Sequence, residues 1–248
     1  MENLRPTFKT STTLTVPISV YHLLQDDAFY YGYLKNGKPN IGGFLNHLIP
    51  ELSEHQNDLY HELLRYHDGD AEKAKIGALS IYNVYLNPSA NHDDGTIPFS
   101  FRISENKRDD FLSVHDHLLS FYNSSFTGYI HTLLSEYASK KRNAREYLYA
   151  HRLAKELRTA MNKSCFCNIY TNDSYICLLP ISIEPSPIYD HNYIVGITRD
   201  LQPAAIRLCS VIKATPLDDK LKVTEQMCDS VWDFLEKIYD EEFEECSE

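Results

Sequence analysis

The feature that most constrains the fold is an internal repeat, in which the chain matches itself without a gap at an offset of 85 residues. Residues 14–52 lie on residues 99–137, with six identities among the 39 paired positions and a much better agreement of the apolar pattern. In each copy, alternating apolar residues predict a half-buried strand. A helix, a break and a second helix follow, with Asn40 or Ser125 placed as the N-cap of the second helix. We interpret the repeat as a duplication.

The order strand, helix, turn, helix, present twice, resembles the ribbon-helix-helix family. The resemblance implies that the two strands pair antiparallel, because each strand needs its mate to bury one apolar face. A chain that carries both copies can form the pair within itself, so we expect residues 14–19 beside residues 99–104. Many members of the family read DNA bases with the outward side chains of these strands. The corresponding positions here are Thr13, Thr15, Pro17, Ser19, Ser100, Arg102 and Ser104.

These outward positions are poorly suited to reading DNA. Base readout favours Arg, Lys, Asn and Gln, and Arg102 is the only residue of that kind among them. Pro17 also lacks a backbone donor. Residues 1–137 carry ten Lys and Arg against seventeen Asp and Glu, a charge that opposes binding to a phosphate backbone. We expect the ribbon fold without sequence-specific DNA reading.

The net charge of −11 is unevenly distributed along the chain. Residues 138–168 form a basic block with eight Lys and Arg against two Asp and Glu, whereas residues 217–248 carry three against twelve. A basic block of this kind is either the solvated face of a helix or a polyanion-binding surface. Both interpretations remain open from the sequence.

Several classes of protein are disfavoured by what the sequence lacks. No apolar run approaches the ~18 residues of a transmembrane helix, and the N-terminus has no apolar signal-peptide core, so we expect a cytoplasmic protein without membrane association. The six cysteines form no C-x2-C pair, which argues against a metal site. The sequence offers no nucleophile with a nearby base and no phosphate loop. We therefore expect neither an enzyme nor a cofactor.

The second half reads as a helix at 151–164, strands at 165–170 and 175–188, and a hairpin with strands at 193–197 and 206–212. This order resembles the WYL domain, an SH3-like or Sm-like small barrel of bacterial regulators. Its motif has a strand ending in Tyr, a later Pro, a Trp-Tyr-Leu strand and an Arg-Leu-Asp-Arg-Ile strand. The matching positions are Tyr170, Pro180, Tyr193 and Arg207, and the departures are Asn192, Cys209 and Ser210.

A ribbon-helix-helix unit joined to a WYL domain and a C-terminal segment is similar to the WYL accessory proteins of type VI-D CRISPR systems. That resemblance implies a non-catalytic homodimer that binds single-stranded RNA and stimulates an RNA-guided RNase effector. Single strands are held by positive grooves and aromatic stacking platforms. The alternative for the tyrosines, including Tyr170 and Tyr189, is that they pack in the core. The candidate RNA-binding residues are Tyr193, Arg199, Arg207, Lys213, Arg152 and Lys155.

We expect an α+β protein with a duplicated ribbon-helix-helix unit, an SH3/Sm-like barrel and a C-terminal helical segment. The apolar spacing of that last segment indicates an amphipathic helix that packs on the barrel or forms a dimer seam. Two other functions remain open: a ligand-sensing WYL transcriptional regulator that binds DNA through the ribbon, and a dimeric protein-docking adaptor. The expected parts are residues 1–137 (copies 14–52 and 99–137, helical connector 53–97), 138–216 and 217–248.

Overall fold

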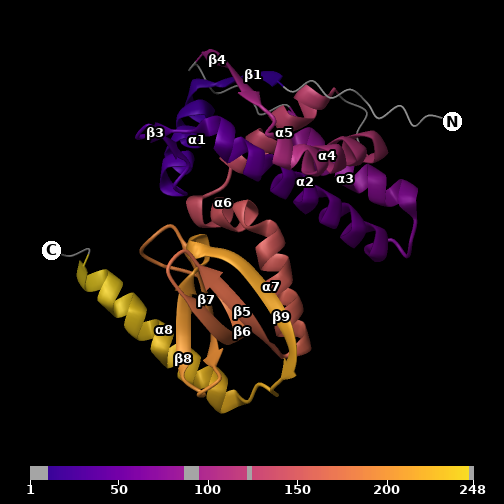
Figure 1. The fold of residues 1–248 in the computed structure, drawn as a ribbon. Coiled ribbons are helices and arrows are strands. Elements are labelled where there is room, and N and C mark those ends of the chain that lie inside the picture. The colour runs from indigo at the N-terminus through magenta and orange to yellow at the C-terminus, as the bar shows by residue number, and fades with distance from the viewer. Residues whose placement is uncertain (1–10, 87–94, 122–124, 246–248) are drawn as a thin grey trace. The chain divides into compact units, whose positions relative to one another are not determined.

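The computed structural model describes residues 11–86, 95–121 and 125–245. It has a mixed α+β fold, and the chain divides into two compact units, Met1–Lys140 and Lys141–Glu248 (Figure 1). Among the described residues, no helix combines the length and the apolar character needed to cross a membrane.

In the first unit, strand β1 (Ser11–Pro17) pairs antiparallel with β4 (Thr96–Arg102). Leu14 lies opposite Phe99, its own match in the repeat. On either side of this pair, Thr13 lies opposite Ser100, the match of Thr15, and Thr15 lies opposite Pro98, the match of Thr13. The two copies are therefore related by a two-fold axis at this pair. The predicted strand pairing is confirmed. The unit's other elements are α1 (Ile18–Tyr30), β2 (Leu34–Lys35), β3 (Lys38–Pro39), α2 (Ile41–Tyr66), α3 (Ala71–Leu86), a 3-10 turn (Glu105–Lys107), α4 (Arg108–Phe121) and α5 (Phe126–Ala138).

The second helices of the two copies begin 85 residues apart and are capped in the same way. The Asn40 side chain accepts a hydrogen bond from Gly43 N at 3.0 Å, and the Ser125 hydroxyl accepts one from Gly128 N at 3.1 Å. Each cap satisfies a backbone donor that the first turn of a helix leaves unpaired. The two predicted N-caps are confirmed.

Helix α2 runs without a break from the first copy into the connector expected to begin at residue 53. Its Asn46 side chain ties this helix to the ribbon: Nδ2 donates to Arg102 O at 2.8 Å, and Oδ1 accepts from Ser104 N at 2.8 Å. Its apolar side chains, including Phe44 and Leu48, are fully buried. The second helix of the first copy and the connector are therefore one structural element.

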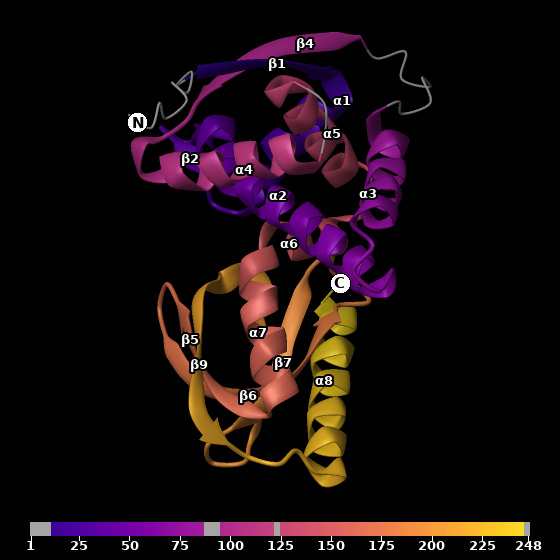
Figure 2. The same ribbon diagram turned by 90° about the vertical axis from the view of Figure 1, so that its right-hand side faces the viewer.

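In the second unit, five antiparallel strands form a sheet in the order β8-β7-β6-β5-β9. Helix α7 (His151–Lys163) packs against one face of this sheet, and α8 (Glu225–Glu245) packs against the other (Figure 2). The remaining elements are α6 (Arg142–Tyr149), β5 (Cys165–Thr171), β6 (Tyr175–Pro185), β7 (Asn192–Thr198), β8 (Pro203–Arg207), a 3-10 turn (Leu208–Ser210) and β9 (Val211–Lys220).

The expected barrel is not closed. Strands β8 and β9 are the two edges of the sheet and do not pair with each other. The physical reason is that α7 fills the inner side of the curved sheet, where its Leu157 and Ala160 pack with Ile169, Ile194 and Ala214 from three strands. We call this the inner face and the opposite side the outer face.

The hairpin is present, but its second strand is shorter than expected. Strand β8 ends at Arg207, and a 3-10 turn with buried Leu208 separates it from β9, so residues 206–212 do not form one strand. Strand β9 continues to Lys220, past the boundary expected at 217. The C-terminal segment consequently contributes its first four residues to the sheet.

A buried carboxylate joins α6 to the sheet. Glu146 Oε2 accepts hydrogen bonds from the backbone and side-chain nitrogens of Asn192, and Oε1 accepts one from Cys209 N at 2.9 Å. Burial raises the pKa of Glu146, and these three hydrogen bonds oppose that shift. The side chain thus organises both the start of β7 and the turn before β9.

Replacing Glu146 with Ala leaves three donors without their acceptor. Each unsatisfied buried donor costs about 1–3 kcal/mol, so we expect Glu146→Ala to lower the free energy of unfolding of the second unit by at least ~3 kcal/mol in urea titrations. The matched control is Glu236→Ala on the exposed side of α8, expected within ~0.5 kcal/mol of wild type. A loss below ~1 kcal/mol for Glu146→Ala would contradict this role.

Candidate nucleic-acid interface

Helix α8 covers only part of the outer face of the sheet. Its Val231 and Leu235 pack with Tyr193, Val195 and Ile197 of β7, and this cluster also contacts Ala205 of β8 and Ile181 of β6. Among the described residues of the second unit, no helix packs on the outer surface of β5, β9 and the first residues of β6 (Figure 1). We call this uncovered surface the open face.

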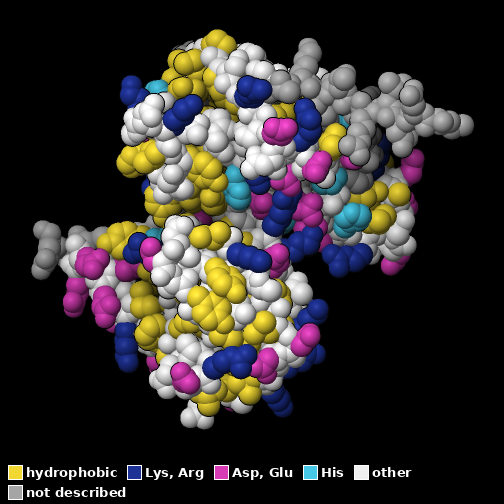
Figure 3. Space-filling model, viewed as in Figure 1, with side chains coloured by type: hydrophobic (Ala, Val, Ile, Leu, Met, Phe, Trp, Pro, Cys, Tyr) yellow, Lys and Arg dark blue, Asp and Glu magenta, His cyan; other side chains and the backbone are white. Residues whose placement is uncertain are grey.

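The sheet register identifies the side chains of the open face. Ile169 and Ala214 point inward, so their neighbours Tyr170 and Lys213, which pair with each other, point outward. Tyr175 pairs with Tyr170 on the other side. Figure 3 shows hydrophobic side chains gathered over this part of the second unit with Lys and Arg side chains at the borders. The open face comprises Asn168, Tyr170, Tyr175, Cys177, Lys213 and Arg199, and the buried Phe166 ring lies under the Arg199 guanidinium.

Two exposed tyrosines form its centre. Tyr170 is 39% and Tyr175 55% exposed, and their ring centroids lie 5.1 Å apart. The Tyr175 hydroxyl donates to Asn168 Oδ1 at 2.9 Å, which restrains its ring. Exposed aromatic rings held side by side on a sheet offer stacking surfaces to planar groups such as unpaired bases.

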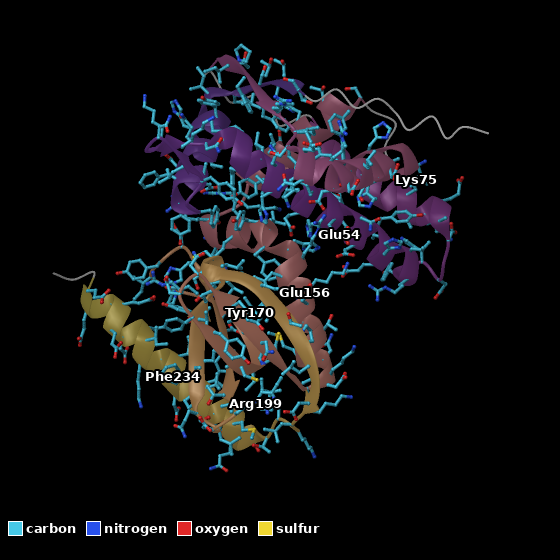
Figure 4. All side chains as sticks on the ribbon, viewed as in Figure 1. Glu54, Lys75, Glu156, Tyr170, Arg199 and Phe234 are labelled. Atoms are coloured by element: carbon cyan, nitrogen blue, oxygen red, sulfur yellow. The ribbon has the colours of Figure 1, made fainter. Side chains whose placement is uncertain are left out.

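Arg199 borders these rings from the turn after β7 (Figure 4). Its guanidinium lies 5.2 Å from the centroid of the Phe166 ring, and Nε is 3.1 Å from Cys177 Sγ. It also forms an exposed ion pair with Asp219 of β9, at 2.9 Å. The contacts orient the arginine over the sheet, while the carboxylate competes with any anion that approaches it.

Tyr193, a predicted stacking residue, is buried. Only 6% of its surface is exposed, because α8 lies on it, and its hydroxyl donates to Glu242 Oε1. The pKa of Tyr193 is raised to about 12, mainly by burial and in addition by the hydrogen bond to Glu242. Tyr193 therefore presents no exposed ring face, unlike Tyr170 and Tyr175.

The Glu242 carboxylate attaches the end of α8 to the sheet. Ser186 Oγ donates to Oε2 at 2.7 Å, and His191 Nε2 lies 3.3 Å from Oε1 without hydrogen-bond geometry. The rings of Tyr189 and His191 are stacked, with their centroids 5.7 Å apart. Burial lowers the pKa of His191, and the nearby Arg207 guanidinium lowers it further. Arg207 is exposed on β8, where it pairs with Tyr193 on the side that carries α8.

The two candidates on α7 lie on the other side of the sheet. Lys155 is exposed and Arg152 is half-buried, and both interact with other groups of the protein. The six candidate residues are thus divided among three places, and only Arg199 and Lys213 share the open face with Tyr170. Helix α7 packs on the inner face, while the charge of Lys213 acts on Glu156 of that helix.

Sequence reasoning did not identify Tyr175, Phe166 or Asn168. Their signal was present: alternation along β5 places Phe166, Asn168 and Tyr170 on one face, and the short connection 172–174 brings Tyr175 opposite Tyr170. A known order of strands was needed to show that this face, unlike that of β7, bears no helix.

The outer side of the β1–β4 ribbon is polar. Thr13, Thr15, Ser100 and Arg102 are exposed as expected, and Thr13 Oγ1 lies 2.7 Å from Ser100 Oγ. The hydroxyls of this pair bond to each other across the ribbon. The other expected positions, Pro17, Ser19 and Ser104, lie at or beyond the strand ends.

Comparisons with known proteins give a fold-level similarity. No family model matches the chain, and no curated protein matches it. A solved structure described as a CRISPR Cas-related protein is similar with a TM-score of 0.56 and 13% identity, over 93% of this chain and 68% of that chain. At this identity the similarity concerns the fold.

Proposed function

We propose that the chain is a non-catalytic, single-stranded RNA-binding accessory protein of a CRISPR system, and that its protein partner is an RNA-guided RNase effector. The observation that carries the proposal is the open face, where Tyr170 and Tyr175 are bordered by Arg199 and Lys213. The fold similarity to a CRISPR Cas-related protein supports the setting. The resemblance to WYL accessory proteins supports the choice of RNA.

The chemistry of the open face favours a single strand over a duplex. Bases in a duplex are stacked on one another, so their faces are not offered to protein side chains. Unpaired bases stack on exposed aromatic rings, with a gain of about 1–3 kcal/mol per base. Two rings with centroids 5.1 Å apart suit neighbouring bases of one strand.

The proposed homodimer would use the outer side of α8. The inner side packs on β7 and β8 through Val231 and Leu235, whereas Trp232 and Phe243 are exposed. Deleting residues 217–248 would remove the end of β9 together with this helix. A substitution at Trp232 or Phe243 is therefore the cleaner variant for testing self-association by sedimentation.

Removing either ring of the open face should weaken RNA binding. We expect Tyr170→Ala and Tyr175→Ala each to raise the Kd for a single-stranded RNA about 5- to 150-fold, the equivalent of ~1–3 kcal/mol, in fluorescence anisotropy. Two controls should bind as wild type: Tyr66→Ala, an exposed tyrosine of α2, and Tyr193→Phe, which alters a buried ring. Wild-type affinity in both open-face variants, with folding verified by circular dichroism, would refute the assignment.

The ion pair between Arg199 and Asp219 predicts a variant that binds RNA more tightly than wild type. Asp219→Asn frees Arg199 for phosphate, so the RNA should bind more tightly at low salt, and the log–log salt slope should steepen by roughly 0.7. Lys213→Ala should flatten the slope by a similar amount, since one phosphate contact is lost. Asp233→Asn on α8 is the control, because it changes the net charge equally at an exposed site outside the open face. Equal effects of Asp219→Asn and Asp233→Asn would show that only net charge matters.

A further inference from the structure

The two copies of the repeat differ where their helices are joined. In the first copy α1 ends at Tyr30, and a short hairpin of β2 and β3 precedes α2. In the second copy α4 continues to Phe121, the position that matches Asn36. Residues 119–121, which match residues 34–36 of the hairpin, are thus helical in the second copy.

The hairpin is held rigidly. Asn36 and Gly37 adopt φ values of 53° and 73°, as the two central residues of a type I′ turn require. Tyr33 N donates to Ala28 O at 2.8 Å, and Asn40 N donates to Tyr33 O at 2.7 Å. The Tyr33 ring also packs edge-on against the buried Phe44. The chain therefore presents the outer side of the hairpin in a fixed conformation.

The hairpin exposes apolar and basic side chains on different faces, because Leu34 pairs with Pro39 on one face and Lys35 pairs with Lys38 on the other. Phe29 is 61% and Leu34 47% exposed, and Tyr30, Lys35 and Lys38 are also exposed. Residues 28–40 contain these two lysines and no acidic residue, although acids exceed bases by seven in residues 1–137. Figure 3 shows hydrophobic side chains gathered over α1 and β3. We call Phe29, Tyr30, Leu34, Lys35 and Lys38 the hairpin knob.

We propose that the hairpin knob is the surface that docks onto the RNase effector, and that it enters an apolar cleft of that protein rimmed by carboxylates. This inference rests on the proposed function. Large exposed apolar side chains held in a fixed conformation are typical of protein contacts, and the two lysines select an acidic rim. A nucleic acid is disfavoured, because single strands follow positive grooves or sheet faces, whereas this protrusion belongs to an acidic unit.

The test uses the full chain and the RNA-guided RNase effector of the proposed function, purified with its guide RNA. We expect Phe29→Ala combined with Leu34→Ala to weaken binding to the effector at least tenfold in interferometry. Lys35→Glu combined with Lys38→Glu should weaken it most at low salt. Both double variants should retain wild-type affinity for single-stranded RNA. Ile76→Ala, an exposed apolar residue of α3, is the matched control and should bind as wild type.

Each other outcome rejects a defined statement. If wild type binds the effector and both double variants bind it equally well, the hairpin knob is not the docking surface, while the proposed function stands. If wild type itself does not bind the effector, the proposed function fails, and the docking surface fails with it. If the variants lose RNA affinity instead, the knob contacts RNA and the docking proposal is wrong.

Discussion

The open face depends on a limit set by the width of a helix. A helix with its side chains is about 10–12 Å wide and neighbouring strands lie ~4.8 Å apart, so one helix covers two to three strands. The sheet has five strands, and among the described helices of the second unit only α8 packs on its outer face, over β7, β8 and one residue of β6. The surface of β5 and β9 is left uncovered as a consequence. Tyr170 is exposed there, whereas Tyr193 of β7 is buried.

The limited helix coverage of the sheet also explains where Glu242, Arg152 and Lys155 lie relative to the open face. Glu242 accepts hydrogen bonds from Ser186 and Tyr193, and so determines where the end of α8 lies on the sheet. The position of α8 in turn determines which rings remain accessible. On the inner face, α7 keeps the sheet from closing, so Arg152 and Lys155 are separated from the open face. The proposed RNA contact thus results from incomplete helix coverage of an open sheet.

Much of the fold could be predicted from the sequence because its signals are local. The alternation around Leu14 and Phe99 and the caps Asn40 and Ser125 depend on neighbouring residues, and they predicted the ribbon and two helix starts. The prediction of a closed barrel was wrong, because closure of the sheet depends on what packs on its inner face, and α7 packs there. The burial of Tyr193 could not be predicted, because it depends on a helix about forty residues later in the chain. Tyr175 was missed for the same reason, since its exposure is a property of the assembled sheet.

The most direct measurement is the location of RNA on the protein. A single-stranded RNA carrying 4-thiouridine can be crosslinked to the full chain by light, and the attached peptides can be identified by mass spectrometry. Binding on the open face predicts crosslinks at Tyr170 and Tyr175, which lie within six residues of sequence. Crosslinks confined to the basic side of α7 or to residues 191–207, with none in residues 165–177, would contradict it.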